Sequence, residues 1–204
     1  TVDYRAGRRR SYRCDMVVNA AGPWAGQLAA LAGLSLPLQP GPGVMVAVEG
    51  RVTNMVINRL HPAGEGDIII PQRRLSLLGT TLWLASDPDV LSPPADQRRR
   101  IIDLCGRMVP AVRDAPVRSV WWAVRPLMAD GDAKDAQAIS RDFGCIDHSE
   151  RDHLEGLISV IGGKATTLRA MAETAADLIC KKTGRRFPCL TRESKLLSHR
   201  LFFK

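Results

Sequence analysis

The stretch Leu157-Ile158-Ser159-Val160-Ile161-Gly162-Gly163-Lys164-Ala165-Thr166-Thr167 contains the signal that decides the fold. Its apolar run at 157–161 predicts a buried strand, and apolar residues at helical spacing over 168–179 predict a helix directly after it. A helix that begins at a glycine pair offers backbone N–H groups and a positive dipole end to an anion or an electron-rich oxygen. Glycine at 162 and 163 allows a ligand to approach closely, and Lys164 adds a positive charge. The alternative is an ordinary strand-to-helix turn with a surface lysine.

A second strand-to-helix turn lies near the start of the chain. Residues 14–19 predict a buried strand, Asn19-Ala20-Ala21-Gly22-Pro23-Trp24 predicts a turn, and residues 24–33 predict a short helix that ends at Gly33. The small residues of this turn permit the close approach of a cofactor or a neighbouring backbone, and Asn19 can cap or bridge. Tight packing of a helix on a sheet is the alternative explanation.

Short β-branched segments between these two turns predict a mostly antiparallel sheet. The predicted strands are 44–48, 55–57, 68–70, 75–80 and 117–124, a helix is predicted at 98–109, and residues 37–43 are predicted to form a loop. The fold class is therefore α/β (α+β), in which two α/β parts flank an inserted antiparallel-sheet domain. We expect a first α/β part at 1–36, the β-rich domain at 37–137, a return to the α/β part at 138–186 and an irregular tail at 187–204.

The composition is that of an ordinary soluble protein. The 204 residues are 45% apolar and 25% charged, which excludes a disordered or collagen-like chain. Lys and Arg total 29 against 21 Asp and Glu, so the formal net charge is +8, which is compatible with nucleic acid, an anionic membrane or a phosphorylated substrate. With two Tyr, four Phe and no nucleic-acid motif, nucleic acid is not predicted. Glycines and prolines interrupt the long uncharged stretch at 16–48, so no transmembrane segment is predicted.

No metal site is predicted from the cysteines and histidines. The five cysteines have no C-x-x-C spacing and are expected to be free thiols. His148 and His153 are five residues apart, which differs from the i, i+4 spacing of a helical metal pair. We expect Asp147 and Asp152, beside them, to lie at the surface.

Two arginines are candidates for anion binding. Arg125 follows an apolar strand in Val124-Arg125-Pro126-Leu127, and Arg141 lies in Ser140-Arg141-Asp142. A guanidinium can engage two oxygens of a phosphate or carboxylate at once. A surface ion pair is the alternative for each arginine.

Seven motifs occur together in one order along the chain. They are Val17–Trp24, Val56–Arg59, Asp67–Pro71, Ser76–Thr81, Val124–Leu127, Ile139–Asp142 and Ile161–Arg169. In this order they resemble the FAD-dependent glycerol-3-phosphate dehydrogenase family, within the D-amino-acid-oxidase-like flavoprotein superfamily. The elements at 56–59 and 147–156 are most similar to those of the A subunit of the anaerobic enzymes. The resemblance covers about residues 14–189.

The resemblance implies FAD as cofactor and a partial FAD-binding Rossmann-like domain. The residues implied to line the cofactor are Asn19, Ala20, Ala21, Gly22, Trp24, Gly162, Gly163, Lys164, Ala165 and Thr166. The residues implied to bind substrate are Arg125, Arg141, Lys164 and Thr167, with Arg125 and Lys164 in catalytic roles. No residue is identified as the catalytic base.

The resemblance further implies oxidation of sn-glycerol 3-phosphate to dihydroxyacetone phosphate. Electrons would pass through partner subunits to a quinone pool, which implies a cytoplasmic location, peripheral to the inner membrane. Two alternatives stay open: an FAD-dependent amino-acid or 2-hydroxy-acid oxidoreductase of the same superfamily, or a non-catalytic remnant.

Three features depart from the family pattern. The Gly-x-Gly-x-x-Gly fingerprint is not found, the usual Lys-Gly-Ser segment appears as Pro42-Gly43-Val44, and the cysteine-rich C-terminal domain of the anaerobic enzymes is absent. We therefore expect a fragment that lacks the N-terminal dinucleotide-binding unit and that carries no stoichiometric FAD when purified alone.

Overall fold

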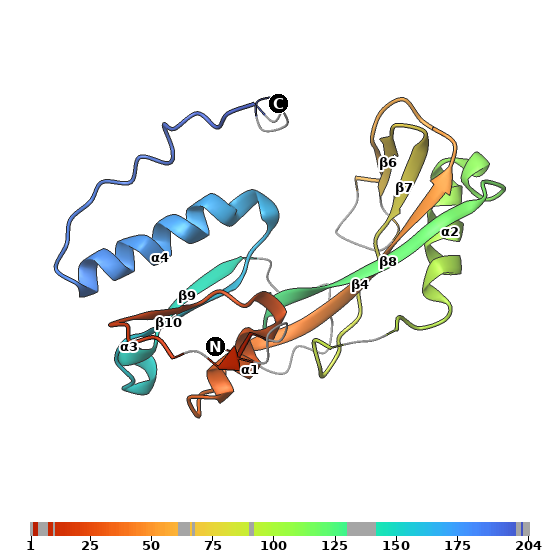
Figure 1. The fold of residues 1–204 in the computed structure, drawn as a ribbon. Coiled ribbons are helices and arrows are strands. Elements are labelled where there is room, and N and C mark those ends of the chain that lie inside the picture. Colours follow the sequence, from red (N-terminus) through yellow and green to blue (C-terminus); the bar gives the residue numbers. More distant parts are fainter. Residues whose placement is uncertain are drawn as a thin grey trace.

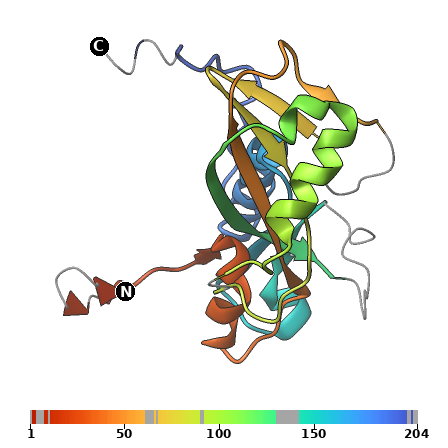
Figure 2. The same ribbon diagram turned by 90° about the vertical axis from the view of Figure 1, so that its right-hand side faces the viewer.

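The structure is a computed structural model that describes residues 2–3, 8–9, 11–60, 66, 68–89, 92–129, 142–198 and 201. Two sheets form the body of the described chain, and helices pack on both (Figure 1). A short antiparallel pair, β1 (Val2–Asp3) with β2 (Arg8–Arg9), lies away from both sheets (Figure 2).

The first sheet has three strands in the order β3-β10-β9. The strands are β3 (Val17–Asn19), β10 (Leu157–Gly162) and β9 (Phe143–Asp147). The central β10 runs parallel to β3 and antiparallel to β9, and all of its residues are buried, as its mostly apolar sequence predicts.

Helices cover both faces of this sheet. Helices α1 (Ala25–Ala30) and α3 (His148–Asp152) lie on one side, and the long α4 (Leu168–Lys182) lies on the other (Figure 1). The 3₁₀ turns η1 (Gly22–Trp24) and η3 (Ala165–Thr167) lead into α1 and α4. Both predicted strand-to-helix units are confirmed, and in each a 3₁₀ turn precedes the α-helix. The expected burial of the first strand is wrong, because Val17 and Val18 of β3 are exposed and only Asn19 is buried.

The second sheet has five antiparallel strands in the order β5-β6-β7-β4-β8. The strands are β4 (Leu38–Glu49), β5 (Ile57–Asn58), β6 (Ile68–Gln72), β7 (Leu75–Gly79) and β8 (Val117–Met128). The predicted antiparallel sheet is confirmed. Strands β4 and β8 are each 12 residues long, longer than the sequence pattern predicts.

The predicted loop at 37–43 is wrong, because β4 continues through Pro40-Gly41-Pro42-Gly43. The carbonyls of Pro40 and Pro42 accept hydrogen bonds from the N–H groups of Ala85 and Trp83. Since the N–H and C=O of one strand residue point to the same side, both prolines direct their missing N–H toward the 83–85 segment and away from β8. Gly41 and Gly43 take the positions between them. Proline is thus compatible with this strand, although a proline-glycine cluster normally predicts a turn.

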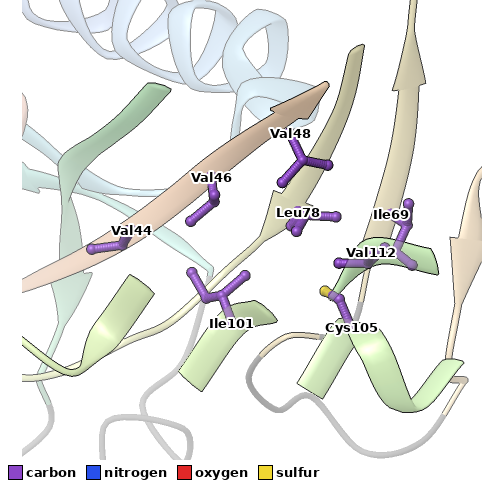
Figure 3. Close-up of a cluster of buried hydrophobic side chains, with 8 residues drawn as sticks. All are labelled: Val44, Val46, Val48, Ile69, Leu78, Ile101, Cys105 and Val112. Atoms are coloured by element: carbon purple, nitrogen blue, oxygen red, sulfur yellow. The ribbon is translucent and has the colours of Figure 1, made fainter. Parts of the chain in front are cut away.

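A cluster of apolar side chains fills the space between the five-stranded sheet and helix α2 (Gln97–Met108) (Figure 3). Alternate residues of β4 point from the sheet to the helix, and Ile101 and Cys105 of α2 point back. The cluster consists of Val44, Val46, Val48, Ile69, Leu78, Ile101, Cys105 and Val112. The last belongs to the 3₁₀ turn η2 (Pro110–Val112) that follows α2.

Strands β4 and β8 connect the two sheets. They run together from the α2 side of the molecule to the three-stranded sheet (Figure 1 and Figure 2). At the end of β8, the Met128 side chain lies so close to Gly144 and Gly162 that a Cβ on Gly162 would lie 2.9 Å from Met128 Cγ. This contact fixes where the five-stranded sheet meets the turn after β10.

The core cluster predicts the effect of truncating its helical member. Replacing Ile101, which is fully buried, with Ala should lower the free energy of unfolding by about 2–4 kcal/mol, because the cavity adds to the lost transfer free energy. Ile102→Ala, on the partly exposed side of the same helix, should cost clearly less. Denaturant unfolding of both variants measures the difference, and equal losses would contradict the assignment of this core.

Candidate functional site

Both predicted strand-to-helix turns lie at one edge of the three-stranded sheet. Strands β3 and β10 are parallel, with Asn19 directly opposite Ser159. The carboxyl ends of parallel strands meet at the same edge of a sheet, which is where open α/β sheets bind ligands. The structure therefore brings the 19–24 turn and the 162–166 turn together, and η1 also contacts β8.

Asn19 is buried, with 1% of its surface exposed, and it fixes the first turn by hydrogen bonds. Its Nδ2 donates to the Ala25 carbonyl at 2.9 Å and to Ser159 Oγ at 3.2 Å. Its Oδ1 accepts from the Ala21 N–H at 3.3 Å. The side chain thus holds both sides of the turn together.

The remainder of the first turn is open to solvent. Gly22 has φ of +57°, and among the described residues, its two neighbours in sequence aside, no atom lies within 4 Å of the place where a Cβ would stand. The indole of Trp24 donates from Nε1 to Asp89 Oδ1 at 2.8 Å. Trp24 also lines an open hollow of about 460 Å³ between this turn and residues 122–124 of β8.

The glycines of the second turn are required by the packing of the chain itself. Gly162 and Gly163 both have positive φ, +73° and +81°. A Cβ on Gly162 would lie 2.3 Å from the Asp142 carbonyl, and one on Gly163 would lie 2.5 Å from Met171 Sδ. Because neighbouring groups already fill the space that a side chain would need, glycine has a structural role at both positions. That the two glycines also line the cofactor stays a prediction.

The residues after the glycines present polar groups to solvent. Lys164, Ala165 and Thr166 are exposed, and within the described part of the chain Lys164 forms no ion pair and the N–H groups of Ala165 and Thr166 form no hydrogen bond. Thr167 caps the turn instead: its Oγ1 accepts from the Lys164 N–H and donates to the Lys164 carbonyl, both at 2.9 Å. An anion or an electron-rich ring edge could occupy this open helix entry.

The guanidinium of Arg125 is seated in the five-stranded sheet. Its Nη2 donates to Thr80 Oγ1 at 3.0 Å, and its Nη1 donates to the carbonyls of Thr81 at 3.3 Å and Gly41 at 3.4 Å. A Cβ on Gly43 would lie 2.3 Å from Nη1. Glycine at 43 therefore makes the seat, and the three acceptors fix the plane of the guanidinium.

Arg125 lies three residues before Met128 on β8, so its Cα is roughly 10 Å along the strand from the residue that contacts Gly162. The structure places it on the strand that leads to the two turns. Arg141 lies outside the described residues, so its place relative to Arg125 and Lys164 stays a prediction.

A buried polar cluster behind the first turn was missed by the sequence reasoning. The ring of His148 is fully buried, with Nδ1 at 2.6 Å from Asp152 Oδ2 and Nε2 at 2.8 Å from Ser159 Oγ. The signal that could have found it is the i, i+4 spacing of His148 and Asp152 on one helix, whereas the search for a metal pair compared His148 with His153.

The expected surface position of Asp147 is wrong, and Asp152 is only partly exposed. The Asp147 carboxylate is 8% exposed and accepts a hydrogen bond from Lys182 Nζ at 2.9 Å, because α4 packs on β9, which ends at Asp147, and Lys182 is the last residue of α4. Burial opposes ionisation of Asp147, but hydrogen bonds from Lys182 and Ser149 outweigh it and hold its pKa below the ordinary value of 3.8. Asp152 is 20% exposed and bonded to both Arg151 and His148.

Comparison with known proteins identifies the family. Residues 1–178 match the family described as FAD dependent oxidoreductase. The chain belongs to this family. The predicted superfamily, fold class and FAD dependence are confirmed by this match. The exposed groups of the two turns fit such a cofactor. Gly22 leaves space, Lys164 offers a cation, and Ala165 and Thr166 offer N–H donors that are unpaired within the described residues.

Relatives of known activity cover nearly all of this chain. The A1 subunit of the anaerobic glycerol-3-phosphate dehydrogenase of Haloferax volcanii is 37% identical over 192 residues, which are 93% of this chain and 33% of that protein. The A subunit of the Haemophilus influenzae enzyme is 32% identical over 196 residues, or 95% of this chain and 35% of that protein. The solved glycerol-3-phosphate dehydrogenase of Bacillus halodurans, complexed with FAD, superposes with a TM-score of 0.69 at 27% identity, covering 92% of this chain and 36% of that chain.

The chain thus spans about a third of the length of the proteins it matches. Among the residues that the structure describes, no helix has the length and apolar character needed to cross a membrane.

The half-buried Asp147–Lys182 pair predicts a pH-dependent contribution to stability. Asp147 has a lowered folded-state pKa, so its contribution is complete above its ordinary pKa of 3.8 and is lost as pH falls through the lower folded-state value. Lys182→Met should therefore lower the melting temperature relative to wild type at pH 5–7, and the difference should shrink at more acidic pH.

Thermal unfolding of wild type and variant across pH 2.5–7 measures this difference. Lys181→Met is the matched control, because Lys181 is 75% exposed and lies 3.9 Å from Glu150, so it should change little at any pH. A Lys182→Met deficit that stays constant down to the lowest pH would contradict the pairing.

Proposed function

We propose that this chain forms part of an FAD-dependent dehydrogenase that oxidises sn-glycerol 3-phosphate to dihydroxyacetone phosphate. The observation that carries the proposal is the Gly43 seat, which holds the Arg125 guanidinium at a fixed orientation on the strand leading to the two cofactor turns. The glycerol-3-phosphate dehydrogenases that match 93–95% of this chain support the same substrate.

A phosphomonoester binds to cations, and the described residues of the site supply two, of which Arg125 is held by hydrogen bonds. Arg125 presents a planar guanidinium whose rotation is restricted by Thr80 and Thr81, so little conformational entropy is lost when a phosphate binds. Lys164 adds an exposed ammonium at the second turn. We assign Arg141 to the same pocket from the resemblance alone.

The reaction removes two electrons and two protons from the C2 carbinol. When bound, FAD supplies the acceptor for the hydride that leaves C2. The N–H groups of Ala165 and Thr166 stabilise the negative charge that develops beside the turn, because the backbone of the capped turn orients them before the reaction begins, and Lys164 adds a positive charge. Asn19 holds the other turn in place, and Trp24 covers its outer side.

The electrons then leave through partner subunits to a quinone pool. The partner subunits are proposed because the anaerobic relatives are themselves subunits. The quinone pool is proposed from the family resemblance alone. With it we propose a cytoplasmic location in which the enzyme is peripheral to the inner membrane.

The substrate assignment is tested with the purified holoenzyme and an artificial electron acceptor. Glycerol 3-phosphate should be oxidised with a kcat/KM far above that of glycerol, a 2-hydroxy acid or an amino acid. Preference for the 2-hydroxy acid or the amino acid would establish the other superfamily activity, and no turnover by the FAD-loaded protein would establish a non-catalytic remnant.

The seat of Arg125 predicts that lysine cannot replace it. Arg125→Lys should lower kcat/KM for glycerol 3-phosphate, mainly by raising KM. The loss of transition-state stabilisation should be about 2–3 kcal/mol, because one ammonium cannot reproduce a two-point contact with phosphate. Gly43→Ala should act in the same direction, since its Cβ would displace Nη1. FAD content should stay at the wild-type level in both variants.

The matched control for this pair is Arg118→Lys. Arg118 lies on the same strand but is exposed and paired with Glu49 at 2.8 Å, so its kinetics should equal wild type. If Arg125→Lys also shows wild-type kinetics, Arg125 does not belong to the pocket.

Lys164 predicts a measurable effect on the flavin or on the phosphate. If Lys164 stabilises negative charge at the cofactor, Lys164→Met should lower the reduction potential of the flavin while KM changes little. If Lys164 binds the phosphate of the substrate, the variant should raise KM and leave the reduction potential unchanged. We expect both quantities to change, because the lysine lies at the turn where both ligands meet. Potentiometry and steady-state kinetics separate the two roles, with Lys181→Met as control, and a variant unchanged in both would reduce Lys164 to a solvated residue.

A further inference from the structure

The buried side chains behind the first turn form one continuous hydrogen-bonded chain. It runs from Asp152 through His148 and Ser159 to Asn19. His148 and Ser159 are 0% exposed, and Asn19 is 1% exposed. None of the roles assigned above uses His148, Asp152 or Ser159.

The Asp152 carboxylate sets the direction of the hydrogen bond that it shares with His148. Hydrogen bonds from Arg151 and His148 hold the pKa of Asp152 below its ordinary value, so the carboxylate is ionised and can only accept. His148 Nδ1 therefore donates to Asp152, and its Nε2 lies 2.8 Å from Ser159 Oγ, within hydrogen-bond distance.

Ser159 Oγ accepts from Asn19 Nδ2 at 3.2 Å and lies 2.8 Å from His148 Nε2. This fixes which end of the Asn19 amide is nitrogen. The second Nδ2 proton donates to the Ala25 carbonyl, and Oδ1 remains to accept the Ala21 N–H. Rotation of the amide by 180° would place its oxygen against the Ala25 carbonyl and leave the Ala21 N–H without an acceptor.

The same network anchors the segment that follows helix α1. Arg151 donates from Nε to Asp152 Oδ2 at 2.9 Å and from Nη2 to the Ser35 carbonyl. The segment from Asn19 to Ser35 is thus held at both ends by side chains connected to Asp152. Gly22 and Trp24, two of the residues predicted to line the cofactor, lie within this segment.

We propose that Asp152, His148 and Ser159 are positioning residues that orient Asn19 and so hold the 19–24 turn in its FAD-binding conformation. This inference deepens the proposed function, on which it rests only for the assignment of the turn to FAD. The Asp-His-Ser order has the hydrogen-bond geometry of a nucleophilic triad. Because His148 and Ser159 are fully buried, however, the Ser159 hydroxyl contacts Asn19 of the turn and is not accessible to a substrate.

The test measures the affinity of the apo-enzyme for FAD, by fluorescence titration without substrate. Ser159→Ala removes the hydroxyl between His148 and Asn19, and its Kd for FAD should rise roughly tenfold, the effect of one buried hydrogen bond on the bound conformation. The visible absorption bands of the bound flavin should shift, because the turn that contacts it is no longer fixed. Ser159→Cys, nearly isosteric, should lie between wild type and Ala and replaces it if Ala fails to fold.

A matched control separates positioning from a general loss of stability. Ser76→Ala also removes a fully buried hydroxyl, which donates to the Gly50 carbonyl and accepts from the Val52 N–H in the other sheet. It should lower the melting temperature but leave the Kd for FAD and the flavin spectrum unchanged.

Rescue at His148 gives a second readout. A glutamine at 148 can place its Oε1 near the position of Nε2 and accept from Ser159, whereas a leucine cannot. His148→Gln should therefore keep an FAD affinity closer to wild type than His148→Leu.

Each outcome decides the proposal. An unchanged Kd and spectrum in both Ser159 variants, an equal rise in Kd for Ser76→Ala, or equal affinities for His148→Gln and His148→Leu would overturn it. These readouts need no turnover, so a holoenzyme that binds FAD but does not oxidise glycerol 3-phosphate would refute the proposed function and leave this inference standing.

Discussion

The pairing of β4 with β8 over its whole length is the constraint on which the rest of the structure depends. One end of this two-stranded unit forms the apolar core with α2, and the other end meets the turn after β10 through Met128. Arg125 lies between these ends, so its position relative to the two turns is set by a rigid ladder of hydrogen bonds and not by a loop. A site built on strands in this way keeps its geometry when no ligand is bound.

Local sequence patterns predict the parts of this fold that depend on local physics. The apolar run of β10, the helical stripe of α4 and the short strands of the second sheet were all confirmed, because burial on both faces or on one face leaves a direct trace in the sequence. The prediction of a loop at 37–43 was wrong because the structure of this segment depends on distant residues. Proline and glycine predict a turn from local preference, but whether a missing N–H faces a partner strand is decided by pairing with residues 83–85, more than 40 positions away.

The candidate site shows the same division. The two turns were predicted, and the parallel pairing of β3 with β10 brings them together. The fit of Gly43 under Arg125 and the filling of the Gly162–Gly163 space by Met128 and Met171 could not be predicted, since each is a contact that only the folded chain creates. For the buried His148, the sequence offered only the i, i+4 spacing to Asp152. A glycine in a motif therefore does not by itself indicate a ligand.

Hydrogen-bond satisfaction separates the groups that hold this site from the groups that are available to a ligand. The side chains of Asn19, Ser159 and Thr167 form hydrogen bonds within the chain, so they hold the turns in place. The N–H groups of Ala165 and Thr166 are exposed and, within the described residues, unpaired, and the Lys164 ammonium beside them forms no ion pair there. Since a buried donor without a partner is costly, open donors persist at the surface where water or a ligand can accept from them. The affinity of the site for an anionic or electron-rich group is therefore expected to come from residues 164–166, and its precision from the paired side chains behind them.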